Sequence, residues 1–403
     1  MERQILHIDV NNAFLSWTAI EMLKDGYEVD IRTIPSVIGG DESKRSGIVL
    51  AKSNKAKTCG VVTGETLYQA RKKCPILQVF PGNYRIYKEY SNNLYNLLLE
   101  YTDKIERFSI DECFLDMTYY LQGDTLINKA KEISKRVKEE LGFTVNIGVA
   151  NNKLLAKMAS DFTKPDKIHT LYKYEIPFKM WNLPVGELFM LGKKTVPKLQ
   201  NMRIKTIGDL AKTDEEILIK KFGKFGKTIW EYANGIDDSE VNYKYELPKS
   251  VGNSITLPQD IYEIEKLEEI LLALSEQVAY RLQKYNLIAN TVSVQLRTKE
   301  FQDFSHQSKL LVATSNTNNI YCTAKQLLNS MYKRGTPIRL IGLRADKLVD
   351  KDNAQISLFD DNENKKQDKL DKTLYDIKQK YGYNSITRAG KMNINEIINT
   401  NKM

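Results

Sequence analysis

The spacing of hydrophobic and polar residues predicts an alternation of strands and helices in the first part of the chain. Residues 4–10, "QILHIDV", alternate and are rich in β-branched side chains, which predicts a buried strand. Helical spacing follows at 13–24, so Asp9 is expected at a strand-to-helix junction. Residues 84–105 have the pattern of an amphipathic helix, and "RFSIDECFLDM" at 107–117 predicts the next strand.

The same pattern continues to residue 162 and indicates one mixed layer. A helix is expected near 125–141, a strand at 143–150 and a helix at 151–162. Strands and helices in this order around one sheet are typical of an α+β layer of ferredoxin-like type.

The pattern changes after residue 166. Two lysine-rich segments each place a glycine-containing turn between short helices, and 242–254 has the composition of a basic linker. Residues 255–350 predict a second α+β unit, in which "NTVSVQLRTKEF" alternates cleanly along a strand. From 351 the chain is polar and charge-mixed, which favours a flexible tail with one short helix near 370–381.

Composition and charge narrow the class of protein. The chain has 403 residues, a formal charge of +9 and 42% hydrophobic residues, as in a soluble protein of several domains with a polyanionic partner. Ribosome-associated and merely soluble basic proteins share this balance. Four cysteines without metal-binding spacing, and an acidic N-terminus, predict a reduced cytoplasmic protein. No apolar run approaches the roughly 20 residues needed to span a bilayer, so no membrane partner is expected.

Two adjacent carboxylates, Asp111 and Glu112, lie within an apolar stretch, where uncompensated charge is costly. A solvated turn is the ordinary explanation of such a pair. However, Asp9 also lies at a predicted strand end, and neighbouring strands would bring the three carboxylates together. Such a group requires cations, and Mg²⁺ prefers hard oxygen ligands. Two Mg²⁺ ions about 4 Å apart would suit an in-line phosphoryl displacement.

Motifs along most of the chain carry a family resemblance. "HIDVNNAF" at 7–14 and "SIDECFLD" at 109–116 resemble the Y-family translesion DNA polymerases, the bacterial polymerase IV-like and UmuC-like group. The strings "AKSNKAKTCGV", "FPGNYRIYKEYS", "GVANNKLLAKMASDFTKPD", "LGKKTVPKLQNMRIKTIGDLA" and "KSVGNSITLPQDI" resemble further family segments in the family's order. The resemblance covers roughly residues 4–350.

The resemblance implies a right-hand polymerase. The expected parts are a ferredoxin-like palm, small fingers, a thumb of helix-hairpin-helix units and an α+β little finger. Their expected bounds are palm 1–19 and 76–165, fingers 20–75, thumb 166–241, linker 242–254, little finger 255–350 and flexible tail 351–403.

The activity that the resemblance implies is template-directed DNA synthesis of low fidelity and low processivity. It implies primer–template DNA and deoxynucleoside triphosphates as substrates, a monomeric enzyme, and a role in DNA repair, replication past lesions and SOS mutagenesis. One alternative is a catalytically weak DNA-binding or clamp-associated repair protein that retains the fold. A nucleotide cyclase with a similar palm is disfavoured, because its glycine-rich acidic signature is absent from the sequence.

The resemblance also implies roles at the carboxylates. Asp9 and Asp111 would hold two Mg²⁺ ions with help from the Val10 carbonyl, and Glu112 would complete the metal and catalytic site beside the primer 3′ hydroxyl. Phe14 would exclude a ribose 2′-hydroxyl as a steric gate. The alternative for Phe14 is an ordinary core residue of an amphipathic helix.

Three further residues are expected to contact the incoming nucleotide. Lys164 would reach its triphosphate. Asn54 and Lys57 stand where the family commonly has tyrosine and arginine, and lysine lacks the bidentate fork of arginine. We therefore expect a weaker grip on the nucleotide at these two positions.

The expected DNA contacts lie in the thumb and the little finger. Turn amides and helix N-termini of helix-hairpin-helix units bind phosphates. The alternatives are ordinary helix corners and a solvated sheet face. The candidate DNA-binding residues are Gly192, Lys193 and Lys194 in the first unit, Gly226 and Lys227 in the second, and Arg297 on the little-finger sheet.

The tail contains "QISLF" at 355–359, which resembles the peptide that docks bacterial polymerases on the sliding clamp. Leu358 and Phe359 would fill an apolar pocket, and Gln355 would form a hydrogen bond at its edge. The alternative is a tail segment that packs on its own domain.

Overall fold

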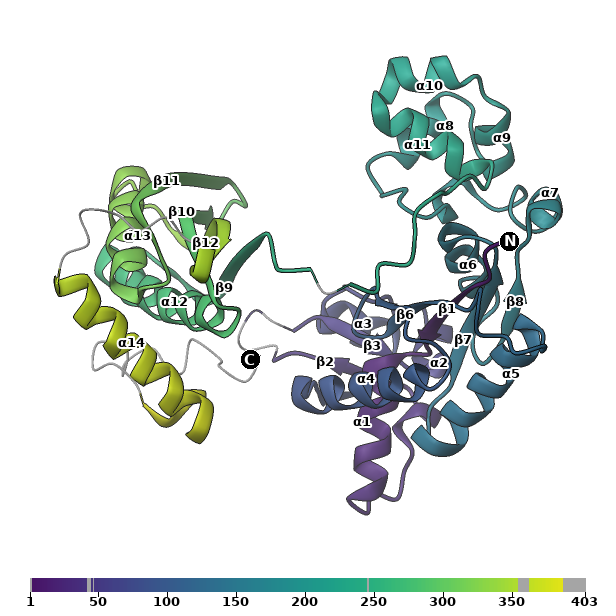
Figure 1. Ribbon diagram of the computed structural model, residues 1–403, viewed down its shortest axis with the longest axis horizontal. Coiled ribbons are helices and arrows are strands. Elements are labelled where there is room, and N and C mark those ends of the chain that lie inside the picture. The colour runs from purple at the N-terminus through teal and green to yellow at the C-terminus, as the bar shows by residue number, and fades with distance from the viewer. Residues whose placement is uncertain (1, 42–44, 46, 245, 354–361, 387–403) are drawn as a thin grey trace. The chain divides into compact units, whose positions relative to one another are not determined.

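The computed structural model describes residues 2–41, 45, 47–244, 246–353 and 362–386. The chain divides into two compact units (Figure 1). The first contains Met1–Gly39 and Val49–Lys244, and the second contains Gly40–Ile48 and Tyr245–Met403.

A five-stranded sheet is the centre of the first unit, with strand order β5-β6-β1-β7-β8. The central strand β1 pairs antiparallel with both β6 and β7, which places Asp9 opposite Glu112 on one side and Asn146 on the other. The predicted α+β fold is therefore confirmed for this layer. The strands are β1 Ile5–Val10, β5 Ile105–Arg107, β6 Glu112–Asp116, β7 Val145–Ala150 and β8 Ile168–Thr170.

Helices cover both faces of this sheet, because β1 is buried on each side. Leu6, Ile8 and Val10 pack with side chains of α1, α4 and α5, whereas Ile5 packs with side chains of α6. Alternation along the strand therefore directs His7 and Asp9 to the α6 face. The helices are α1 Ala13–Lys24, α4 Tyr84–Leu99, α5 Leu126–Arg136 with a π-helical turn Val137–Leu141, and α6 Lys153–Ser160.

A small second sheet in the first unit has the order β3-β2-β4. It pairs β2 antiparallel with β3 and parallel with β4, over a small apolar core that includes Val37, Val49 and Leu67. Its elements are β2 Ser36–Gly39, β3 Val49–Lys52, β4 Gln78–Pro81, α2 Asn54–Thr58 and α3 Leu67–Lys73, preceded by the 3₁₀ turn Ile31–Thr33.

Short helices form the last part of the first unit, as the sequence predicted. One detail of that prediction was wrong: Gly226 lies not in a turn but inside α11, where it is buried and its amide donates to the Gly223 carbonyl at 2.9 Å. Gly223, with φ +64°, makes the turn between α10 and α11. The helices are α7 Ile176–Lys179, α8 Val196–Asn201, α9 Ile207–Lys212, α10 Glu215–Phe222 and α11 Lys224–Ala233, with 3₁₀ turns Lys173–Glu175 and Val185–Glu187.

The second unit is a four-stranded antiparallel sheet, β11-β10-β12-β9, packed against two helices. Val292, Val294 and Leu296 of β10 are buried, as their alternation predicted. The elements are β9 Ser250–Ile261, α12 Ile264–Lys284, β10 Leu287–Thr298, β11 Asp303–Thr314, α13 Thr317–Met331 and β12 Ile338–Asp350.

A C-terminal helix, α14 Asn362–Tyr381, lies beside α12 and is followed by the 3₁₀ turn Tyr383–Ser385 (Figure 1). Asp371 of α14 accepts a hydrogen bond from the Thr317 amide at 2.8 Å, at the start of α13. The predicted clamp-binding residues Gln355, Leu358 and Phe359 lie outside the described residues. None of the helices that the structure describes is long and apolar enough to cross a membrane.

Candidate active site

Three carboxylates meet where β1 ends and β6 begins. Asp9 and Glu112 are directly opposite each other in the antiparallel ladder. The Val10 amide donates to the Asp111 carbonyl at 3.0 Å, which brings Asp111 beside the end of β1. All three side chains line one cavity of about 390 Å³, together with Val10 and Phe14. The structure thus brings together the carboxylates that the sequence placed at two strand ends.

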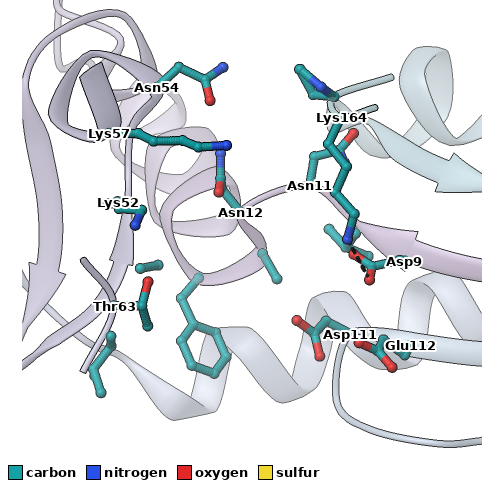
Figure 2. A pocket seen from close by; sticks show the side chains of 16 residues that line it. Asp9, Asn11, Asn12, Lys52, Asn54, Lys57, Thr63, Asp111, Glu112 and Lys164 are labelled. Atoms are coloured by element: carbon teal, nitrogen blue, oxygen red, sulfur yellow. Dashed lines mark hydrogen bonds and ion pairs between the residues drawn. The ribbon is translucent and has the colours of Figure 1, made fainter. Parts of the chain in front are cut away.

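The cavity lies between the large sheet and the small sheet of the first unit. Figure 2 shows Asp9, Asp111, Glu112 and Lys164 on one wall, and Lys52, Asn54, Lys57 and Thr63 on the other. The remaining lining residues are Val10, Asn11, Asn12, Ala13, Phe14, Leu50, Ala51 and Pro165.

Burial sets the electrostatics of the carboxylates. The side chain of Asp9 is 10% exposed, and desolvation raises its pKa above the usual value although Lys164 and Lys157 oppose this effect. Desolvation also acts to raise the pKa of Glu112, but His7 and the charge of Lys157 outweigh it, so this pKa lies below its usual range. The two carboxylates therefore share one cationic partner, Lys157, but their pKa values are shifted in opposite directions.

Two lysines pair with Asp9 and Glu112 of this cluster. Lys164 Nζ lies 3.0 Å from Asp9 Oδ2, a contact that Figure 2 draws as a dashed line. Lys157 Nζ lies 3.5 Å from the same oxygen and 3.1 Å from Glu112 Oε1. Sequence reasoning identified Lys164 and missed Lys157. The available signal was a single charge in the apolar segment "LLAKMAS", on the face that also carries Leu154 and Met158.

The donor set fits a hard divalent cation, because all three acidic groups offer carboxylate oxygens to one cavity. Within the part of the chain that the structure describes, no group of three or more acidic, histidine or cysteine side chains is already close enough to hold an ion. The reason is visible in the contacts. Asp9 faces the two ammonium groups, whereas Asp111 accepts a hydrogen bond of 2.6 Å from Ser109 Oγ.

Phe14 contributes an aromatic wall to the cavity. Its ring stacks on Tyr87 at a centroid distance of 4.5 Å and an angle of 11°, and it meets Tyr84 edge-on at 5.9 Å. Both partners belong to α4. The ring is therefore held by packing and also faces the cavity, so neither sequence-based interpretation excludes the other.

The opposite wall begins at α2. Ser53 caps this helix by accepting from the Ala56 amide at 3.1 Å, which places Asn54 and Lys57 on its first turns. Both side chains are exposed and line the cavity. Lys52, which the sequence analysis did not single out, also lines it and donates to the Val61 carbonyl at 2.8 Å.

A buried amide network fixes the segment that carries Lys164. Asn11 Nδ2 donates to Asn146 Oδ1 at 3.1 Å, and Asn146 Nδ2 donates to the carbonyls of Ser160 and Thr163 at 3.0 Å. Asn11 Oδ1 also accepts from the Asp166 amide at 2.8 Å. The segment on both sides of Lys164 is therefore tied to β1 and β7.

None of the expected DNA-contact residues lines this cavity. Gly192, Lys193 and Lys194 are exposed ahead of α8, and Lys227 is exposed on α11. Arg297 of the second unit forms a bidentate pair with Asp303, at 2.8 and 2.9 Å. The amide of Gly226 is already used within α11, so it is not available to a phosphate.

Comparisons with known proteins cover nearly the whole chain. A model of the impB/mucB/samB family matches residues 8–161, and a model of that family's C-terminal domain matches residues 248–358. DNA polymerase IV of Clostridium acetobutylicum is 50% identical over 389 residues, which cover 96% of this chain and 98% of the relative. DNA polymerase IV 1 of Bacillus subtilis is 36% identical, with 97% of this chain and 93% of the relative covered.

The fold agrees with these sequence matches. A solved Y-family DNA polymerase chimera is similar with a TM-score of 0.75 and 25% sequence identity, over 86% of this chain and 99% of the chimera. The predicted resemblance is confirmed: the chain belongs to the impB/mucB/samB family, within the Y-family DNA polymerases.

Proposed function

We propose that the cavity at the ends of β1 and β6 is where this chain joins a nucleotide to a primer. Family membership makes the chain a translesion DNA-directed DNA polymerase, with DNA and deoxynucleoside triphosphates as its substrates. The alternative of a non-catalytic DNA-binding relative is not favoured. The observation that carries the site assignment is the convergence of Asp9, Asp111 and Glu112 on one cavity that also exposes Phe14.

The carboxylates would hold two Mg²⁺ ions. Asp9 and Asp111, with the Val10 carbonyl, are the proposed ligands, and Glu112 would complete the set beside the primer hydroxyl. When bound, the ions supply activation of the attacking oxygen and stabilisation of the leaving oxygen. The protein supplies the oxygen ligands and a partly buried setting, in which electrostatic interactions are stronger than in water.

The nucleotide would lie between the two walls of the cavity. Lys164 on one wall and Lys57 on the other provide positive charge for the triphosphate, with Asn54 beside Lys57. Lysine binds phosphate as a point charge and does not fix its orientation bidentately. We therefore propose a grip that depends on charge more than on geometry, and that weakens with salt.

Phe14 would select the sugar. Tyr87 and Tyr84 support the ring from behind, so it resists displacement by an additional hydroxyl group. A rigid apolar wall discriminates against a ribonucleotide in two ways: the 2′-hydroxyl overlaps the ring, and it finds no hydrogen-bond partner there.

The proposed DNA contacts are sequence-tolerant. Lys193, Lys194 and Lys227 are exposed and suited to phosphate oxygens, and Arg297 can contribute once Asp303 releases it. Docking of Gln355, Leu358 and Phe359 on a sliding clamp, and a monomeric state, remain predictions from the sequence.

The test is Mg²⁺-dependent extension of a labelled primer by wild type and by Asp111→Ala. We expect the variant to lose extension while its affinity for primer–template DNA stays close to wild type. Glu106→Gln is a matched control, because Glu106 lies on the adjacent strand β5 and pairs with Lys153 outside the cavity. Extension by Asp111→Ala at the wild-type rate would refute the site assignment.

A further inference from the structure

Helix α6 carries a buried charge that the proposed chemistry does not use. Its residues from Leu154 to Ser160 are all buried, and Lys157 is the one charged side chain among them. The helix approaches the sheet closely because β7 has a glycine at position 148, where a Cβ atom would overlap the Ala156 carbonyl. This close approach brings the middle of α6 to the back of the carboxylate cluster.

Lys157 contacts three carboxylates at once. Its Nζ lies 3.1 Å from Glu112 Oε1, 3.2 Å from Asp161 Oδ2 and 3.5 Å from Asp9 Oδ2. The side chain is 9% exposed, against 34% for Lys164. Lys164 lines the cavity and Lys157 does not, so a nucleotide in the cavity would meet Lys164 first.

The other neighbour of Glu112 on this side is His7. Its Nε2 lies 3.5 Å from Glu112 Oε2, longer than a good hydrogen bond, and its Nδ1 lies 2.7 Å from Ser160 Oγ at the end of α6. The Lys157 ammonium group lies closer, 3.1 Å from Glu112 Oε1, and is the lysine that faces Glu112 from behind.

A purely structural role for Lys157 is the natural alternative. One turn earlier on α6, Lys153 shows such a role: it pairs with Glu106 at 2.7 Å, remote from the cavity. Lys157 differs because two of its three partners are the proposed metal ligands Asp9 and Glu112. Two negative groups directly opposite each other in a ladder repel, and the ammonium group offsets this repulsion before any metal arrives.

We infer that Lys157 is a positioning residue that holds Asp9 and Glu112 ready for a divalent cation and, by its charge, weakens the binding of that cation. The inference rests on the proposed function of these carboxylates. A divalent ion on the same oxygens would lie near the ammonium group, where like charges repel strongly in a partly buried site. Removal of the Lys157 charge should therefore raise the affinity for the divalent cation and lower the rate of nucleotide incorporation.

The test uses Mn²⁺ as the probe. Free Mn²⁺ is measured by electron paramagnetic resonance in titrations of the full chain, and the rate constant of single-nucleotide incorporation is measured separately in a single turnover. For Lys157→Met we expect Mn²⁺ to bind at least about threefold more tightly and incorporation to slow at least about tenfold. Lys157→Arg, which keeps the charge, should retain the weaker Mn²⁺ binding of wild type.

Lys153→Met is the matched control, because it removes a lysine ion pair from the same helix without touching Asp9 or Glu112. Its Mn²⁺ affinity should equal that of wild type. The inference is wrong if Lys157→Met binds Mn²⁺ no more tightly than wild type, or if it incorporates nucleotide within about threefold of the wild-type rate. It is equally wrong if Lys157→Arg binds Mn²⁺ as tightly as Lys157→Met.

Asp161→Asn gives an independent test should Lys157→Met fail to fold, since the Asp161 side chain is 44% exposed. Asp161 pairs with Lys157 and also with Lys164, at 2.9 Å. Without its negative charge, the ammonium groups of Lys157 and Lys164 are balanced only by the carboxylates of Asp9 and Glu112. We expect Mn²⁺ to bind more weakly than to Asp166→Asn, which removes an equal charge that pairs with Lys138. Equal affinities of these two variants would contradict the inference.

Asp111→Asn separates this inference from the proposed function. If Asp111→Asn binds Mn²⁺ like wild type, the proposed metal site itself is wrong. If Asp111→Asn loses Mn²⁺ binding but Lys157→Met binds Mn²⁺ as wild type does, the proposed metal site is supported and only the proposed role of Lys157 is wrong.

Discussion

Asp9 and Glu112 face each other directly across the β1–β6 ladder, and one lysine, Lys157, contacts both carboxylates from the α6 side of the sheet. The arrangement places two acidic groups in the lining of the cavity, with the charge of a lysine behind them. The lysine offsets the repulsion between the two carboxylates, which can then lie side by side at the ends of two interior strands and still offer oxygen ligands to a metal ion.

Sugar selection should depend on the Phe14 ring. Phe14→Ala removes a wall that Tyr87 and Tyr84 support, so ribonucleotides should be incorporated at least about tenfold more often relative to deoxynucleotides. Competition between the two nucleotides in single-turnover assays measures the ratio. Phe14→Tyr keeps the ring and should retain most of the selectivity. An unchanged ratio in Phe14→Ala would leave Phe14 as a packing residue only.

His7 should stay neutral across the physiological range. Burial lowers the pKa of His7 to about 4. Between pH 6.5 and 4, His7 is therefore protonated in the unfolded chain but remains neutral in the folded chain. Stability of the first unit should therefore fall as the pH drops through this window, and His7 should account for about 3 kcal/mol of that loss.

Carbon-13 labelling of the three histidines allows a direct check of His7. Its imidazole signal, assigned by its loss in His7→Gln, should keep the neutral position from pH 8 down to pH 5. The stability of His7→Gln should depend less on pH than that of wild type over the same range. A His7 signal that titrates with a midpoint above pH 6 would show that the imidazole is accessible to protonation.

Two glycines in the region of short helices, Gly192 and Gly226, should respond differently to a methyl group. A Cβ atom at Gly226 would overlap the Leu218 backbone where α10 meets α11, so Gly226→Ala should destabilise this region by at least about 2 kcal/mol. Gly192 has open space around its Cα, and Gly192→Ala should change stability by less than about 0.5 kcal/mol. Thermal unfolding followed by tryptophan fluorescence, with Trp230 on α11 as one reporter, compares them. Equal melting temperatures would contradict the close packing of α10 on α11.

Clamp docking can be tested on the sequence motif alone. Leu358→Ala combined with Phe359→Ala should abolish stimulation by a sliding clamp, because the anchors of the peptide are lost. Extension of short templates without clamp should be unaffected. Ile356→Ala, within the same five residues, is the control and should retain stimulation. If the clamp still fully stimulates the double variant, Leu358 and Phe359 are not the residues that dock on it.

Much of the fold could be predicted because periodicity is a local property. β1 and α1 appear within one residue of their predicted bounds, since alternating and helical spacing are unbroken there. The meeting of Asp9 with Asp111 and Glu112 could also be predicted, because each lies at a strand end and the strands share a sheet.

The remainder depends on contacts between distant segments. A lysine in an apolar helix stripe is often a side chain that extends to solvent, so "LLAKMAS" alone did not reveal that Lys157 meets β1 and β6. At Gly226, spacing suggested a turn, but the close approach of α10 requires the glycine in the first turn of α11. For Phe14 the sequence could not decide between a core residue and a cavity wall, because the position of the ring depends on its contacts with Tyr87 and Tyr84.

The cavity at Asp9 is proposed to carry out nucleotide addition and to contribute little to the affinity for DNA. The decisive measurement is single-turnover incorporation by Asp9→Asn with saturating primer–template and Mg²⁺, made beside a DNA-binding titration. We predict a rate at least about 100-fold below wild type with DNA affinity within about twofold, because a proposed metal ligand is lost while the proposed DNA-binding lysines Lys193, Lys194 and Lys227 remain. A near wild-type rate, or a loss of rate fully explained by weaker DNA binding, would contradict the claim.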